Sequence, residues 1–234
     1  MTFEEALRAA RGHHARGELD AALESARRAQ ALGGAQPPLL LLEGDILHDR
    51  GELAAAEERF SRVVAAAPHW APGWMALGRV RMDLERAADA QEAFRAAASA
   101  DPQNARAWNN LGVALERSER FGEAEEAFAR AVAIDPRYAL ATLNLARLRD
   151  GRDTDSALAL AESAVRAEPR LAEAWLLLSD IHRRRLALGH ALSALDAGLR
   201  FAPGDLRLLA ARAEVLSHQG LPAESRGPGR RDRS

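Results

Sequence analysis

The chain has 234 residues, of which 47% are hydrophobic and 28% charged, a balance typical of a soluble protein with a sizeable buried core. Its formal net charge of −2 gives no bulk attraction to nucleic acid or anionic lipid, so neither is an expected partner. It has no cysteine, which excludes disulfides, thiolate metal sites and a cysteine nucleophile.

The N-terminal stretch begins with Thr2 followed three residues later by Glu5, a capping box that predicts a helix starting at about residue 3. Its acidic residues stand where a signal peptide needs a basic region and an apolar core. No apolar run in the chain reaches the roughly 20 residues that span a bilayer. We therefore expect a cytoplasmic protein that does not contact membranes.

Further along the chain, a pattern recurs with a period of 34 residues. Trp108 and Pro136 each stand 34 residues after Trp74 and Pro102. A fixed period of this size predicts one supersecondary unit that is copied and stacked. Within a unit, apolar and small residues fall at i, i+3, i+4 and i+7, and a second such stripe follows, so each unit predicts two amphipathic helices.

The repeats follow one another at residues 3–36, 37–70, 71–104, 105–138, 139–171 and 172–205. The first is degenerate, as expected of a terminal repeat that has no upstream neighbour. The fifth fits only with a one-residue deletion near residues 149–155. Residues 206–219 predict one more, unpaired helix that caps the array. The Arg-rich segment 221–234 predicts a disordered tail.

The best-preserved unit, residues 105–138, resembles the tetratricopeptide repeat. The residues that carry the resemblance are Trp108, Leu111, Gly112, Ala124, Phe128, Ala131 and Pro136, with Leu115 where the family has tyrosine. Residues 71–104 keep the same pattern except for Arg81 at the tyrosine position. The resemblance covers residues 3–219. It implies an all-α, right-handed superhelical solenoid of antiparallel helix pairs, a single domain over residues 1–220 whose first helices line a concave groove.

Positions 2, 6, 9 and 13 of each repeat lie opposite the buried stripe and are expected to face that groove. Asn110 and its equivalent Asn144 occupy position 6, and Asn109 lies beside Asn110 on the flank. An asparagine side chain offers a donor and an acceptor, which matches a peptide unit. The arrangement resembles the asparagine ladder in the repeat domain of O-GlcNAc transferase, where groove amides grip peptide backbones. Solvated polar residues on an exposed helix face are the alternative.

The groove positions also concentrate charged and apolar side chains. Arg79, Arg106, Arg117 and Arg147 occupy them, opposed by Asp83, so the centre of the groove is expected to be positive. Leucines beyond the core stripe are Leu41, Leu42, Leu140, Leu143, Leu176 and Leu177. We hypothesise an extended partner peptide with an acidic group in its middle and apolar anchors on either side. Packing of the leucines against the adjacent repeat is the alternative.

Catalysis is not expected. His14 and His48, with Asp45 and Asp49 at helical spacing, are the residues best suited to a metal, but a solvated helix face is the favoured explanation for them. The chain has no Gly-rich phosphate loop, zinc-protease motif or nucleophile elbow. The carboxylate clamp with which some family members bind chaperone tails matches only at Asn110. We therefore expect no cofactor, no metal, no small-molecule substrate and no chaperone-tail binding.

The sequence thus predicts a non-catalytic scaffold or adaptor that binds an extended peptide or a partner protein. The predicted groove residues are Arg79, Arg106, Asn109, Asn110, Arg117, Asn144 and Arg147. Two alternatives stay open: an accessory subunit that positions a separately encoded enzyme, and a self-associating assembly protein. RNA binding is a third alternative, and the lack of aromatic platforms and the low isoelectric point argue against it.

Overall fold

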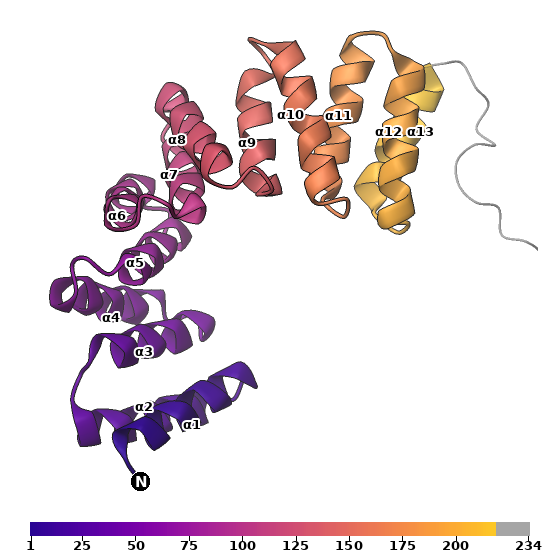
Figure 1. Ribbon diagram of the computed structural model, residues 1–234. Coiled ribbons are helices and arrows are strands. Elements are labelled where there is room, and N and C mark those ends of the chain that lie inside the picture. The colour runs from indigo at the N-terminus through magenta and orange to yellow at the C-terminus, as the bar shows by residue number, and fades with distance from the viewer. Residues whose placement is uncertain (219–234) are drawn as a thin grey trace, which may run out of the picture. The chain divides into compact units, whose positions relative to one another are not determined.

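The structure is a computed structural model that describes residues 1–218, and the expected tail at 221–234 lies outside them. The described residues form thirteen α-helices and no strand, which confirms the predicted all-α class (Figure 1). The helices are α1 (Phe3–Ala15), α2 (Leu19–Gly33), α3 (Pro37–Asp49), α4 (Leu53–Ala66), α5 (Ala71–Asp83), α6 (Ala87–Ala100), α7 (Ala105–Arg117), α8 (Phe121–Ile134), α9 (Ala139–Arg149), α10 (Thr154–Ala167), α11 (Ala172–Arg184), α12 (Leu188–Phe201) and α13 (Leu206–His218). None of them is long and apolar enough to cross a membrane.

Local sequence explains where several helices begin. The Thr2 hydroxyl accepts a hydrogen bond from the Glu5 backbone N–H at 3.2 Å, and the Glu5 carboxylate accepts one from the Thr2 N–H at 2.7 Å. This is the predicted capping box of α1. Asn104 caps α7 by accepting a hydrogen bond from the Ala107 N–H at 3.1 Å. Proline in the first turn starts α3 and α5, where a missing N–H costs nothing.

The chain divides into two compact units, with the division at residues 127 and 128, inside α8. In the first unit, residues 1–127, α1 pairs with α2, α3 with α4 and α5 with α6. Each hairpin packs on the next through the contacts of α2 with α3, α4 with α5 and α6 with α7. The first helices of successive hairpins also touch, α1 with α3 and α3 with α5.

Two glycines allow the helices of a hairpin to approach closely in this unit. A Cβ atom on Gly44 would lie 2.3 Å from the ring of Phe60, and one on Gly78 would lie 2.5 Å from the ring of Phe94. Both rings are buried at the centre of the hairpin core. The glycine and the phenylalanine of each repeat therefore pack against one another, and a larger residue in place of the glycine would collide with the ring.

The second unit begins at residue 128. In it, α9 pairs with α10 and α11 with α12, α10 packs on α11, and α13 packs against both α11 and α12. Leu195, Leu208 and Val215 bury the contact between α12 and α13. Among the described residues α13 is the last helix, and no second helix pairs with it there.

Candidate functional site

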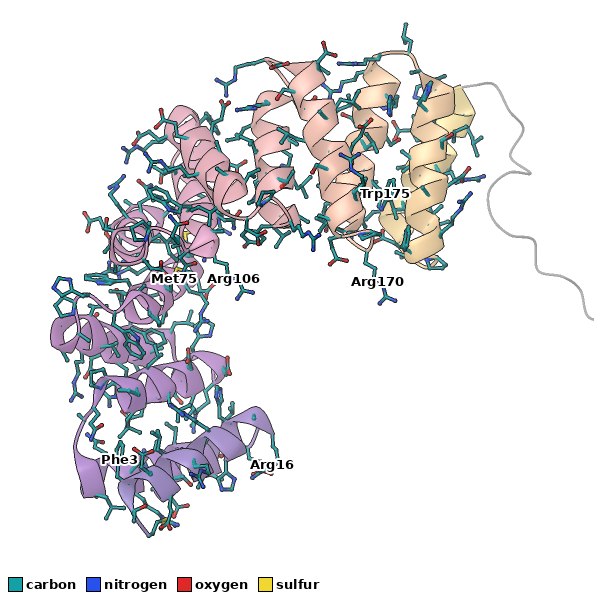
Figure 2. All side chains as sticks on the ribbon, in the orientation of Figure 1. Phe3, Arg16, Met75, Arg106, Arg170 and Trp175 are labelled. Atoms are coloured by element: carbon teal, nitrogen blue, oxygen red, sulfur yellow. The ribbon has the colours of Figure 1, made fainter. Side chains whose placement is uncertain are left out.

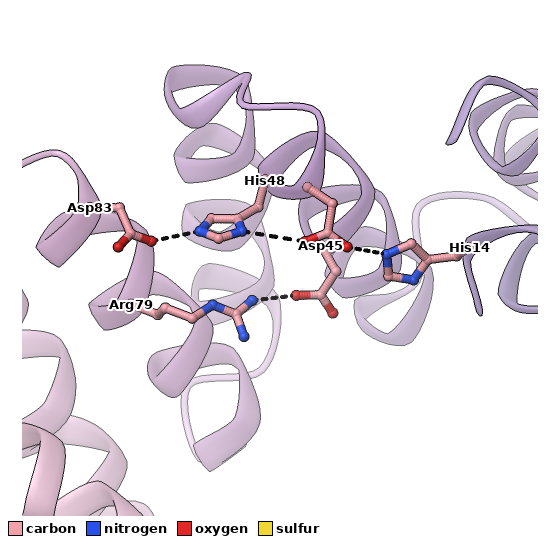
Figure 3. A network of polar contacts seen from close by, with 6 residues as sticks. His14, Asp45, His48, Arg79 and Asp83 are labelled. Atoms are coloured by element: carbon pink, nitrogen blue, oxygen red, sulfur yellow. Dashed lines mark hydrogen bonds and ion pairs between the residues drawn. The ribbon is translucent and has the colours of Figure 1, made fainter. Parts of the chain in front are cut away.

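Side chains on the first helices of unit 1 are joined by polar contacts between one repeat and the next. The His14 Nε2 lies 2.7 Å from Asp49 Oδ2, and His48 Nε2 lies 2.6 Å from Asp83 Oδ2. Arg79 donates a hydrogen bond of 2.6 Å to Asp45 (Figure 3). The partners are 34 or 35 residues apart, one repeat, so these residues share one surface. We call this surface of α1, α3, α5 and α7 the first-helix face.

The histidines of this network are held by carboxylates rather than grouped around a common centre. Asp49 accepts from His14 and also lies 3.6 Å from His48 Nδ1. Although burial opposes it, the hydrogen bonds and charges of the two histidines hold the pKa of Asp49 below its usual value. Within residues 1–218, no three His, Asp or Glu side chains are placed to hold a metal ion.

Beside this network, a cavity of about 220 Å³ opens between α5 and α7. Its lining residues are Arg79, Met82 and Asp83 from α5, Phe94 from α6, and Asn110, Val113 and Arg117 from α7. Three of the predicted groove residues, Arg79, Asn110 and Arg117, are therefore brought together. Arg106 belongs to the same stripe of α7, because residues 106, 110, 113 and 117 recur at intervals of four, three and four.

The structure corrects the expected place of Asn109. Its side chain is only 5% exposed, so it does not line the groove. Instead, its amide Nδ2 donates a hydrogen bond of 3.3 Å to the Oδ1 of Asn110. This bond uses one of the two acceptor sites of the Asn110 oxygen, and the Asn110 amide N–H groups have no partner among the described residues.

Fewer arginines on this face than expected carry a charge that no neighbouring carboxylate compensates. Arg79 is paired with Asp45, and the opposing Asp83 is paired with His48. By contrast, Arg106 and Arg117 are exposed and form no hydrogen bond or ion pair with any residue of the described range, 1–218. Figure 2 shows the Arg106 side chain extending away from α7. On α7, Arg106 and Arg117 therefore carry uncompensated positive charge.

The remaining predicted residues lie in the second unit. Asn144 is half-buried and Arg147 is exposed on α9, and each has a polar or electrostatic partner. Of the leucines beyond the core stripe, some pack in the core and others are exposed, where they could contact a ligand. Leu42 and Leu143 are buried in the hairpin cores, as the packing alternative predicted, whereas Leu140 is 48% exposed.

The sequence reasoning missed the apolar lining of the cavity, formed by Met82, Phe94 and Val113. A signal was available, because Val113 follows Asn110 by three residues and so lies on the same side of α7. Met82 and Phe94 could not be found in this way. Their approach to α7 depends on how neighbouring hairpins pack.

The fold and the face together define a helical-hairpin repeat protein that presents a row of first helices. The family model for the tetratricopeptide repeat matches residues 75–139 and 145–205, more than half of the chain. The chain therefore belongs to the tetratricopeptide repeat family, whose members generally act as non-catalytic scaffolds for protein interaction. None of the curated proteins matches it.

Solved structures support the same fold. The pilF protein of Pseudomonas aeruginosa superposes with a TM-score of 0.77 at 18% identity, covering 91% of this chain and 97% of that one. YrrB, described as a repeat protein with an unusual peptide-binding site, gives 0.63 at 19% identity, covering 84% and 98%. MamA gives 0.63 at 22% identity, covering 70% and 96%. At these identities the likeness establishes the fold.

Proposed function

We propose that this protein is a non-catalytic adaptor that binds an extended segment of a partner protein across the first-helix face of unit 1. One observation carries the proposal: a cavity on that face is bordered by Asn110 and Arg117, whose donors are not used within the described residues. A ligand that supplies backbone carbonyls and carboxylates would satisfy them.

The face is suited to this task because it is formed before the ligand arrives. The pairs of Arg79 with Asp45 and of His48 with Asp83 fix the helices on one side of the cavity. The hydrogen bond from Asn109 fixes the Asn110 amide. Binding therefore requires little ordering of the protein, and more of the contact energy is available for affinity. We also propose, from the repeat pattern alone, that Asn144 and Arg147 of α9 contact a peptide in the second unit.

The test is a pull-down with immobilised wild-type protein and a variant carrying Arg106→Gln and Asn110→Asp, with bound proteins identified by mass spectrometry. Aspartate keeps the acceptor for Asn109 but replaces an outward donor by a negative charge. We expect recovery of specific partners to fall at least about tenfold, because charge-assisted hydrogen bonds are lost. The thermal midpoint should stay close to that of the wild type.

The matched control is Arg95→Gln, which removes an exposed arginine from α6, outside the cavity lining. It should bind like the wild type. Equal recovery by the double variant would exclude this face as the binding site. Recovery of an enzyme as the face-dependent partner would identify the accessory-subunit version, whereas light scattering that shows a concentration-dependent oligomer without any partner would favour self-association.

A further inference from the structure

We propose that the cavity between α5 and α7 selects peptides by one large apolar side chain that lies between two acidic residues about five positions apart. This specificity rests on the proposed function. It adds to that function which residues of a ligand are read and in which order.

The apolar part of the signal follows from the cavity itself. Met82, Val113 and the edge of Phe94 form its hydrophobic lining. Its volume of about 220 Å³ is smaller than the roughly 300–1,000 Å³ of pockets for drug-sized ligands, so it suits a single side chain. Burying such a side chain would remove apolar surface of both partners from water, which favours binding.

The preference for acidic residues in the ligand follows from which polar groups of the cavity already have a partner in the protein. On the α5 side of the cavity, Arg79 is paired with Asp45 at 2.6 Å and Asp83 with His48 at 2.6 Å. On the α7 side, the unoccupied groups are the Arg117 guanidinium and the Asn110 amide, and both donate. Asp83 already has one of its carboxylate oxygens, Oδ2, in contact with His48. A carboxylate of the ligand meets the unoccupied donors of Arg117 and Asn110.

The spacing follows from the two uncompensated arginines of α7. Arg106 and Arg117 are eleven residues apart, so their backbones are separated by about 16 Å along the helix at 1.5 Å per residue. An extended peptide advances about 3.3 Å per residue and covers that distance in about five residues. Val113 lies between the two arginines, which places the apolar side chain between the two carboxylates.

The experiment is selection of a phage-displayed library of random dodecapeptides on the full chain, followed by anisotropy measurements with fluorescent synthetic copies of the enriched peptides. We expect the enriched sequences to share a large apolar residue between two aspartates or glutamates about five positions apart. Replacing the apolar residue by alanine, or either acid by its amide, should weaken binding at least about tenfold.

Three protein variants and one control variant connect this preference to the cavity. Val113→Trp fills the cavity and should weaken binding at least about tenfold, and on this variant the alanine-substituted peptide should lose nothing further. Arg106→Gln and Arg117→Gln should each abolish the preference for one of the two acids. Arg95→Gln should bind like the wild type. Thermal unfolding of each variant shows whether it is folded.

Several results would overturn the proposal: no enriched peptide, enriched peptides without acids, acids at scattered spacings, or full affinity for a folded Val113→Trp variant. The failures of the two proposals are distinguishable. Peptides that need Arg106 and Asn110 but ignore Val113 would refute the selective cavity and leave the binding face standing. Peptides that ignore all of these residues would refute both.

Discussion

Single residues that depart from the repeat pattern are compensated by partners on the neighbouring helix. Arg81 stands where the family has tyrosine, and its Nε lies 3.1 Å from the Glu57 carboxylate while its NH1 donates to the Asp89 carbonyl at 3.0 Å. Glu43 is 5% exposed at a position where later repeats have leucine. Burial raises the pKa of Glu43, and its ion pair with Arg59 at 3.1 Å opposes this shift.

The tryptophan at the start of a repeat has a polar role that its sequence pattern did not indicate. Its indole N–H donates to the carbonyl of the proline that ends the preceding repeat, at 2.8 Å for Trp74, 3.1 Å for Trp108 and 2.9 Å for Trp175. Trp108 is also only half-buried, against alanines of α6 and α7. The residue therefore connects consecutive repeats as well as filling space between them.

We expect Trp108→Phe to lower the free energy of unfolding by about 0.5–1.5 kcal/mol, because the ring is largely kept and one hydrogen bond is lost. Urea denaturation followed by circular dichroism measures this change. Trp70→Phe is the matched control, since the Trp70 indole has no hydrogen-bond partner among residues 1–218. An equal loss in both variants would show that ring size, and not the bond to Pro102, is responsible.

At the scale of the helices, the turn inside a hairpin has one conformation that recurs with the repeat. The residue at its fifteenth position has a positive φ in Gly17, Gly51, Glu85, Glu119 and Leu186. In the last three the backbone is left-handed at φ of 59° or 60°, which costs a residue with a Cβ about 1–2 kcal/mol. These turns therefore keep a strain that the first two repeats avoid with glycine.

Leu186→Gly should raise the free energy of unfolding by about 0.5–1 kcal/mol. Leu186 is 86% exposed, so its side chain contributes little packing. The relief of left-handed strain should exceed the entropy that glycine adds to the unfolded chain. Leu186→Ala keeps the Cβ and should give no such gain in the same denaturation assay. A gain shared by both variants would instead point to the exposed leucine itself.

The sequence predicts features that depend on contacts within one repeat, and it does not predict features that depend on packing between repeats. The helix pairs follow from spacings within one repeat, such as Trp108 to Leu115, so the sequence predicted them. The phase of α7 also placed Asn110 and Arg117 on one side. The burial of Asn109 and the pairing of Arg79 with Asp45 depend on packing between repeats, which periodicity within one helix does not encode.

At the scale of the whole molecule, each of the two units is held together by contacts between helices that are neighbours along the chain. Within each unit, each hairpin touches the next one along the chain, and no pair of more distant helices forms a comparable contact in the described range. The polar contacts of 34 or 35 residues follow the same rule, as in Asp150 with Arg184 and Glu173 with Arg207 in the second unit. Stability in such arrays is a sum of repeat and nearest-neighbour terms.

It follows that a defect in one unit should remain local. Gly78→Ala places a methyl group against Phe94 and should cost about 1–3 kcal/mol, whereas Leu195→Ala opens a void in the second unit and should cost about 2–5 kcal/mol. Native-state hydrogen exchange read by mass spectrometry should show Gly78→Ala lowering protection in α5–α7 and leaving α11–α13 unchanged. Leu195→Ala should give the reverse. If either variant lowered protection evenly from α1 to α13, the chain would unfold as one cooperative block. In that case a partner bound on α5 and α7 would stabilise every helix, and not only the helices next to the binding site.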